Sequence, residues 1–168
     1  MYSKCNHQHQ THFCMKKILL VEDLPEKAED IKREIKCKYP DIQIGECTSY
    51  HSAIEEIFRH HEDYFLILLD ITMSTFDVNI EENGGVPETL AGKKILERMY
   101  LRDIPTKVKV VTMFESFDGK SINQLDKELR QDNPDSYDGY IFFSFKKSDW
   151  KKQLTDYIKT FYDKDINS

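Results

Sequence analysis

The segment that most constrains the fold is Tyr64-Phe65-Leu66-Ile67-Leu68-Leu69-Asp70, an apolar run that ends on a carboxylate. Apolar residues that follow one another without alternation are typical of a strand buried on both faces, as in the middle of a parallel sheet. In open α/β sheets the carboxyl ends of the strands face the ligand crevice. Asp70 directly follows this strand, so we expect its carboxylate at the ligand crevice, where it could take part in a reaction.

The rest of the chain predicts four more strands, and every strand is followed by a helix. Apolar residues recur at helical spacing, as Ala28, Ile31 and Ile35 do in the first helix. Five alternations of strand and helix indicate a parallel sheet with right-handed crossovers. Residues 41–45 alternate apolar and polar side chains and suit an edge, which favours a doubly wound sheet of order 2-1-3-4-5. The other strands are predicted at residues 18–21, 107–112 and 139–143, and the helices at 25–38, 50–60, 91–101, from about 121, and after Ser148.

Length and charge limit the class of protein. A chain of 168 residues with a formal net charge of −6 fits one domain, and its acidity argues against nucleic acid or an anionic membrane as the main partner. No apolar run is long enough to span a bilayer and the first residues lack the apolar core of a signal peptide, so we expect a cytoplasmic location.

The ends of the chain are predicted to be tails. Residues 1–14 are polar and hold three histidines between Cys5 and Cys14, but their spacing matches no standard zinc module, so we expect disorder there. The domain is then predicted over residues 15–163, with a short tail at 164–168. Residues 75–90 contain Gly84, Gly85 and Pro87 and are predicted to form a long loop beside Asp70.

Further polar residues leave the predicted sheet near Asp70. Glu22 and Asp23 follow the first strand, and Thr112 closes the fourth. Three carboxylates at adjacent strand ends repel one another, and a hard divalent cation such as Mg²⁺ would compensate them. Asp70 could then attack a phosphoryl donor, with the Thr112 hydroxyl on a phosphoryl oxygen. The competing interpretation is that these acids only solvate a loop-bearing face.

These residues also carry a family resemblance. The chain resembles the receiver domain of two-component response regulators over residues 16–162, which implies a flavodoxin-like receiver fold. By that likeness Asp70 accepts the phosphoryl group from a histidine kinase, and Mg²⁺ is bound by Glu22, Asp23, Asp70 and the backbone carbonyl of Thr72. Thr112 would be the switch hydroxyl, and Tyr140 the switch aromatic. The motifs are Ile-Leu-Leu-Val-Glu22-Asp23, Leu-Ile-Leu-Leu-Asp70-Ile-Thr-Met, Gly92-Lys-Lys-Ile-Leu, Val-Lys-Val-Val-Thr112 and Asp138-Gly-Tyr140.

The chain departs from the receiver pattern at several positions. Phe143 and Ser144 stand where receivers have a phosphate-contacting lysine and, usually, a proline. Lys146 and Lys147 follow, but they are more simply read as solvated lysines at the start of a helix. Ser74 replaces the proline usual after the phosphoacceptor's loop, while Met113 and then Phe114 follow Thr112 where a small residue is usual.

Two functions remain open from the sequence. The first is a stand-alone receiver that is phosphorylated on Asp70 by a histidine kinase or phosphotransfer protein, signals by contact with another protein, and is not an enzyme in its own right. The second is a phosphorylation-independent pseudo-receiver that acts as an interaction module. The missing lysine favours the second, whereas Glu22, Asp23, Asp70 and Thr112 favour the first.

Overall fold

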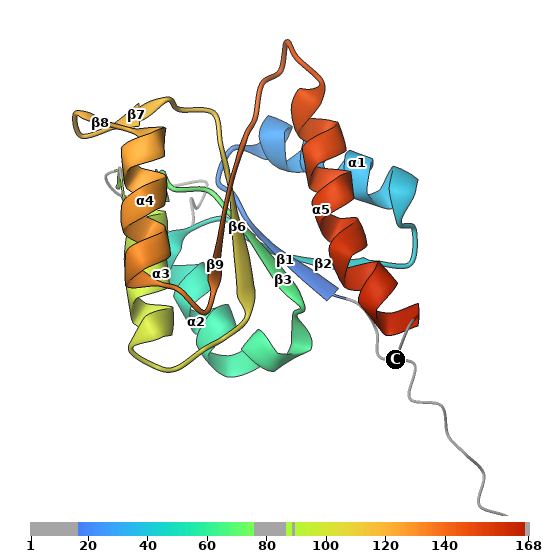
Figure 1. Cartoon of the computed structure of the whole chain (residues 1–168), viewed down its shortest axis with the longest axis horizontal. Helices are drawn as coiled ribbons and strands as arrows, with labels where there is room; N and C mark the ends of the chain where they lie inside the picture. Colours follow the sequence, from blue (N-terminus) through green and yellow to red (C-terminus); the bar gives the residue numbers. More distant parts are fainter. Residues whose placement is uncertain (1–16, 76–86, 89, 167–168) are drawn as a thin grey trace, which may run out of the picture.

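The protein is built on one five-stranded parallel sheet with helices on both faces (Figure 1). The computed structural model describes residues 17–75, 87–88 and 90–166. The strand order is β2-β1-β3-β6-β9, and all four neighbouring pairs are parallel. When these five strands are numbered by their order in the chain, their order across the sheet is 2-1-3-4-5. The predicted fold class and topology are therefore confirmed. The strands are β1 (Lys17–Val21), β2 (Gln43–Cys47), β3 (Leu66–Leu69), β6 (Lys107–Thr112) and β9 (Tyr137–Phe142).

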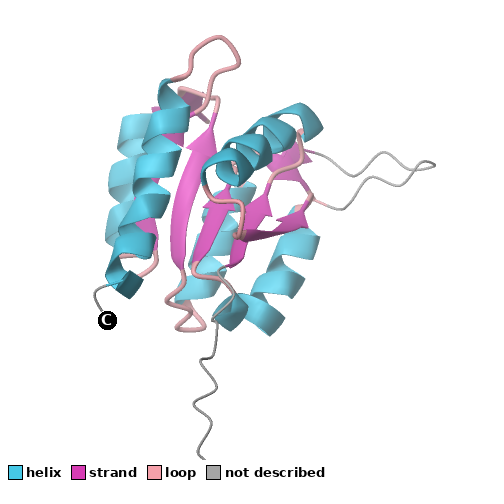
Figure 2. Cartoon of the chain, turned by 90° about the vertical axis from the view of Figure 1, so that its right-hand side faces the viewer, coloured by secondary structure: helices cyan, strands magenta, loops and turns pink. Residues whose placement is uncertain are grey.

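The five helices divide between the two faces of the sheet, as Figures 1 and 2 show. Helices α1 (Pro25–Lys38) and α5 (Asp149–Ile166) cover one face, and α2 (Tyr50–His60), α3 (Ala91–Tyr100) and α4 (Ile122–Asp132) cover the other. A 3₁₀ turn, η1 (His61–Asp63), follows α2. Local sequence fixes several helix starts: Pro25 occupies the first turn of α1, and Ser49 and Ser121 form capping boxes at α2 and α4.

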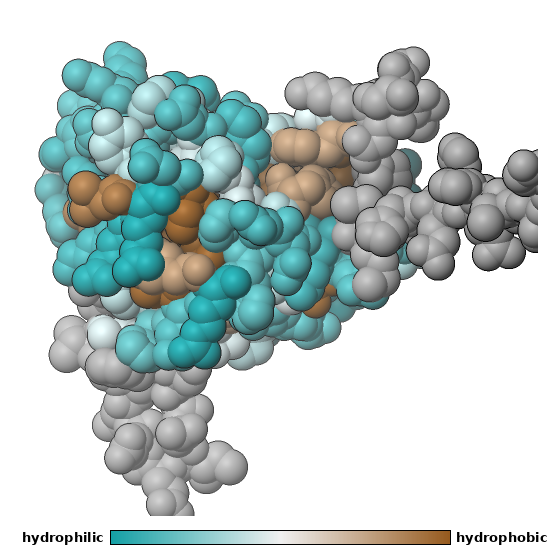
Figure 3. All heavy atoms as spheres, turned by 90° about the horizontal axis from the view of Figure 1, so that it is seen from below, coloured by the Kyte–Doolittle hydropathy of each residue, from teal (hydrophilic) through white to brown (hydrophobic). Residues whose placement is uncertain are grey.

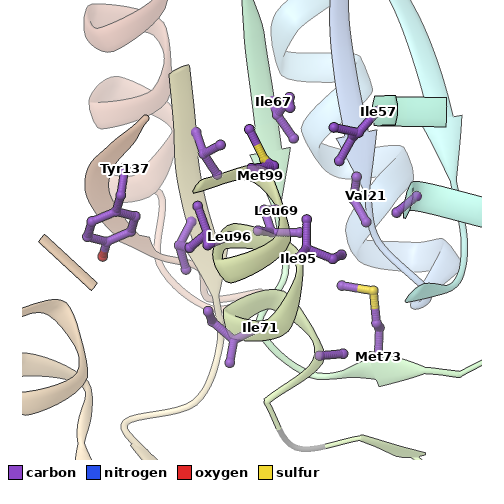
Figure 4. Close-up of a cluster of buried hydrophobic side chains, with 14 of the residues drawn as sticks. Val21, Ile57, Ile67, Leu69, Ile71, Met73, Ile95, Leu96, Met99 and Tyr137 are labelled. Atoms are coloured by element: carbon purple, nitrogen blue, oxygen red, sulfur yellow. The ribbon is translucent and has the colours of Figure 1, made fainter. Parts of the chain in front are cut away.

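Each face of the sheet has its own apolar core. The larger one joins β3 to α2, α3 and α4, and Figure 4 shows Ile67 and Leu69 of β3 against Ile95 and Met99 of α3. The smaller one packs α1 and α5 on the opposite face of the same strands. The β3 residues Leu66–Leu69 are buried without exception, which explains why this strand has no polar alternation.

Two short antiparallel ribbons extend the carboxyl edge of the sheet. Strand β4 (Met73–Ser74) pairs with β5 (Pro87–Glu88), and β7 (Ser116–Phe117) pairs with β8 (Lys120–Ser121). The second ribbon turns through Asp118 and Gly119, both with positive φ, which a tight hairpin turn requires. Most of the predicted loop at 75–90, namely residues 76–86 and 89, lies outside the described residues, as does the predicted tail at 1–14.

Some predicted boundaries were wrong by two residues. Strand β2 begins at Gln43 and ends at Cys47, because Ile42 belongs to a turn in which its N–H donates to the Tyr39 carbonyl. Strand β9 begins at Tyr137, two residues early, because it passes through a bulge: the register with β6 shifts beside Gly139, where φ is +86°. Helix α5 runs to Ile166, and the predicted domain bounds at residues 15 and 163 stay a prediction.

The face of the protein that is seen from below is mainly polar. Figure 3, viewed from below, shows hydrophilic residues around smaller groups of apolar ones. None of the helices in the described part of the chain is both long and apolar enough to span a membrane.

Candidate functional site

The structure brings the three predicted acids together at the carboxyl ends of β1 and β3. Glu22, Asp23 and Asp70 each offer a carboxylate oxygen, and these oxygens lie within 4.8 Å of one another. Backbone hydrogen bonds continue the sheet ladder one residue beyond the strands, because Asp70 N–H donates to the Val21 carbonyl at 2.9 Å and Glu22 N–H to the Cys47 carbonyl at 3.0 Å. Glu22 and Asp70 are buried, and Asp23 is partly buried.

Backbone and side-chain donors orient each carboxylate. The Glu22 Oε1 atom accepts from Leu24 N–H at 2.9 Å, and Asp70 Oδ1 accepts from Ile71 N–H at 2.9 Å. Asp23 Oδ2 accepts from both the N–H and the hydroxyl of Ser74, at 2.8 and 3.1 Å. Ser74, which replaces the proline of the receiver pattern, thus ties β4 to the acidic site.

A buried lysine completes the site, and sequence reasoning missed it. Lys27 Nζ lies 2.6 Å from Glu22 Oε2 and 3.2 Å from Asp70 Oδ1, and it donates to the Val111 carbonyl at 2.7 Å. The residue is fully buried, in the first turn of α1. One signal was present: Lys27 stands four residues before Ile31, on the same helix face that enters the core.

Burial changes the acidity of the site. Burial raises the pKa of the Glu22 carboxyl to about 7; the Lys27 ammonium opposes this rise, and the negative charge of Asp70 adds to it. Burial also raises the pKa of Asp70, again against the effect of Lys27. A cation that entered the site would favour the ionised form of both acids.

The other predicted residues lie on neighbouring elements. Thr112 is fully buried at the end of β6, next to β3 in the sheet, and its hydroxyl oxygen accepts from Phe114 N–H at 3.2 Å. The Tyr140 hydroxyl donates to Asn123 Oδ1 of α4 at 2.9 Å, so its ring lies toward α4. Thr72 is partly buried two residues after Asp70, and the metal-binding role of its carbonyl stays a prediction.

The residues that depart from the receiver pattern differ from one another in how far they are buried. Phe143 is buried, with its ring centroid 4.6 Å from that of Trp150. Lys146 and Lys147 are exposed, in agreement with the interpretation as solvated lysines. Phe114 is 46% exposed and meets Phe117 edge-on at 6.1 Å, so it is not packed away in the core.

The donor set suits Mg²⁺. Three carboxylates supply the hard oxygen ligands that this ion prefers. Three carboxylates and the one ammonium of Lys27 leave two negative charges when all four groups are ionised, which a divalent ion would balance.

Comparisons with known proteins agree with the fold. No family model matches the chain. The chain is 30% identical over 143 residues to the Detocs response regulatory protein DtcB of Enterobacter cloacae, covering 82% of this chain and 95% of that protein. Among solved structures, the Francisella response regulator 1452 receiver domain matches with a TM-score of 0.62 at 18% identity, over 89% of this chain and 98% of that one. A chain of the CheX-CheY-BeF3-Mg²⁺ complex from Borrelia burgdorferi matches with a TM-score of 0.61 at 16% identity, over 87% of this chain and 89% of that one.

The fold and the acidic site define a receiver domain. The chain belongs to the response regulator receiver family, and DtcB is a relative that it matches over nearly that protein's whole length.

Proposed function

We propose that the chain accepts a phosphoryl group on Asp70 in a Mg²⁺-dependent reaction, from a histidine kinase or phosphotransfer protein, and passes the signal on by protein contact. The observation that carries the proposal is the convergence of three carboxylates within 4.8 Å, one of them at the exit of the central strand. The name of the relative DtcB, a response regulatory protein, supports a signalling role.

The arrangement of Asp70 suits a nucleophile. Among the residues that the structure describes, both Ile71 N–H and Lys27 Nζ reach Oδ1, which leaves Oδ2 for the attack on phosphorus. The new bond joins Oδ2 to phosphorus, while the phosphorus–nitrogen bond of a phosphohistidine breaks and its electron pair stays on the imidazole. Mg²⁺, held by Glu22, Asp23, Asp70 and the Thr72 carbonyl, would neutralise charge on the transferred group.

Thr112 has the role of a sensor in this proposal. Its hydroxyl can donate to a phosphoryl oxygen while its oxygen still accepts from Phe114 N–H. Tyr140, on the adjacent strand β9, would then respond by changing its contact with Asn123 of α4.

The test is the intact mass of the protein after incubation with acetyl phosphate and Mg²⁺. We expect a gain of one phosphoryl group that depends on Mg²⁺ and is absent from Asp70→Asn and Asp70→Ala. A parent protein that stays unmodified by acetyl phosphate and by phosphohistidine donors would refute the proposal. The chain would then act as the phosphorylation-independent interaction module.

A further inference from the structure

Lys27 is a buried cation in direct contact with the phosphoacceptor, and it comes from α1 rather than from the end of β9. All three N–H bonds of its ammonium have an oxygen in reach: Glu22 Oε2, Asp70 Oδ1 and the Val111 carbonyl. An ammonium without solvent contact is costly unless it is paired in this way. The side chain is therefore held beside Asp70 by Glu22, after β1, and by Val111 of β6, as well as by its own helix.

The residue directly after β9 is aromatic and lies near the Lys27 ammonium. Phe143 follows β9 and packs against Trp150 with the two rings tilted, and its ring centroid lies 5.9 Å from Lys27 Nζ. The Phe143 N–H donates to the Thr112 carbonyl at 2.7 Å, which fixes the aromatic residue beside the strand that bears the switch hydroxyl. An apolar ring thus lies near the Lys27 ammonium just after β9, while the positive charge reaches the acids from α1.

We propose that Lys27 binds the phosphoryl group on Asp70, a role that rests on the function proposed above. Transfer of the group replaces one negative charge on the carboxylate by two on the acyl phosphate. Among the described residues, Lys27 is the cation within ion-pair distance of Asp70, and its ammonium needs only to move from Oδ1 toward a phosphoryl oxygen. Glu22 and the Val111 carbonyl keep two of its three hydrogen bonds during that move.

Because Lys27 belongs to α1, phosphorylation would change a part of the structure other than the contact between Tyr140 and α4. Lys27 belongs to the first turn of α1, and α1 packs on α5 in the smaller core. A movement of the Lys27 ammonium on phosphorylation would therefore act on the α1 and α5 layer. Trp150, which is the one tryptophan of the sequence and packs against Phe143, lies where it would report this movement.

The opposing interpretation is that Lys27 only neutralises the acids and has no contact with the phosphoryl group. Lys27→Met alone does not separate the two, because removing one partner of a buried ion pair is strongly destabilising. Glu22→Gln combined with Lys27→Met removes one charge of each sign and keeps the net charge of the acidic site. Glu22→Gln alone is its reference, and Lys38→Met, at an exposed lysine of the same helix, controls for loss of a lysine.

The experiment measures acetyl phosphate loading by intact mass, and binding of beryllofluoride with Mg²⁺ by Trp150 fluorescence. Relative to Glu22→Gln, the double variant should load about 100-fold more slowly, as when one preorganised donor to a developing charge is removed, and should bind beryllofluoride more weakly. Adding Phe143→Lys to the double variant should restore part of the loading rate, since it brings an ammonium toward the acidic site from the end of β9. Lys38→Met should load like the parent.

Equal loading rates and equal beryllofluoride affinities in the double variant and Glu22→Gln would overturn the role of Lys27. That result differs from failure of the proposed function, in which the parent protein itself does not load. A fall in loading that matches only a fall in the folded fraction, measured by circular dichroism at the assay temperature, would also overturn it.

Discussion

Gly92, at the start of α3, lies against the backbone that carries the phosphoacceptor. Its N–H donates to the Ile71 carbonyl at 2.9 Å. A Cβ atom at this position would lie 2.5 Å from the Asp70 carbonyl oxygen and 2.9 Å from Ile71 Cα. An ordinary carbon–oxygen contact is about 3.3 Å, so Gly92→Ala requires a relative displacement of roughly 0.8 Å between α3 and the Asp70 backbone.

Two effects on stability oppose each other in Gly92→Ala. Overpacking costs about 1–3 kcal/mol, while alanine favours a helix over glycine by up to about 1 kcal/mol. We expect a net loss of about 1 kcal/mol in the free energy of unfolding, which lowers Tm by about 2–4 °C. The effect on phosphoryl loading should be larger, because a misplacement of about 1 Å can cost on the order of 100-fold in rate.

Urea denaturation and acetyl phosphate loading measured on the same samples would test this. Gly45→Ala is the matched control, because the new Cβ would meet the Tyr64 hydroxyl at 2.6 Å, a side-chain contact. It should lower stability by a comparable amount and leave loading unchanged. If Gly92→Ala loads at the parent rate, or loses loading only in step with its folded fraction, the reasoning about the Asp70 backbone is wrong.

Three further predictions concern the acidic site. Mg²⁺ should raise the melting temperature of the parent, and Glu22→Gln with Asp23→Asn should abolish that rise; an unchanged response would show that the metal site lies elsewhere. Because the pKa of Glu22 is raised to about 7, the folded chain keeps a proton that the unfolded chain loses above about pH 4.5. The free energy of unfolding without metal should therefore fall by on the order of 3 kcal/mol as the pH rises from about 4.5 to 7, and a pH series on Glu22→Gln should lack this contribution. Finally, Phe114 offers no hydrogen bond to an attacking water, so Phe114→Ala should speed loss of the phosphoryl group; time courses that coincide with the parent would exclude such shielding.

Hydrophobic patterning was enough to predict the sheet. The unbroken apolar run of β3 and the alternating edge strand β2 determine the strand order, and the observed order agrees. The boundaries of β2 and β9 were less predictable. A turn that buries Ile42 and a bulge at Gly139 depend on tertiary contacts, which no local pattern records.

The acids of the site were predictable, whereas their counter-ion was not. Glu22, Asp23 and Asp70 could be placed because each follows a strand whose end is visible in the sequence. Lys27 sits in the first turn of a helix, where lysines are usually solvated. Only its spacing from Ile31 indicates the buried face, and its contact with Asp70 depends on how α1 packs against β3.

The ribbon formed by β4 and β5 has a practical consequence for protein engineering. Ser74 pairs with Pro87 and also supplies both donors to Asp23. A redesign of this edge of the protein should therefore retain both Ser74 and Pro87. A deletion that includes Ser74 removes these two donors to the Asp23 carboxylate. Ser74 is thus the residue at which one substitution would act on the ribbon and on the acidic site together.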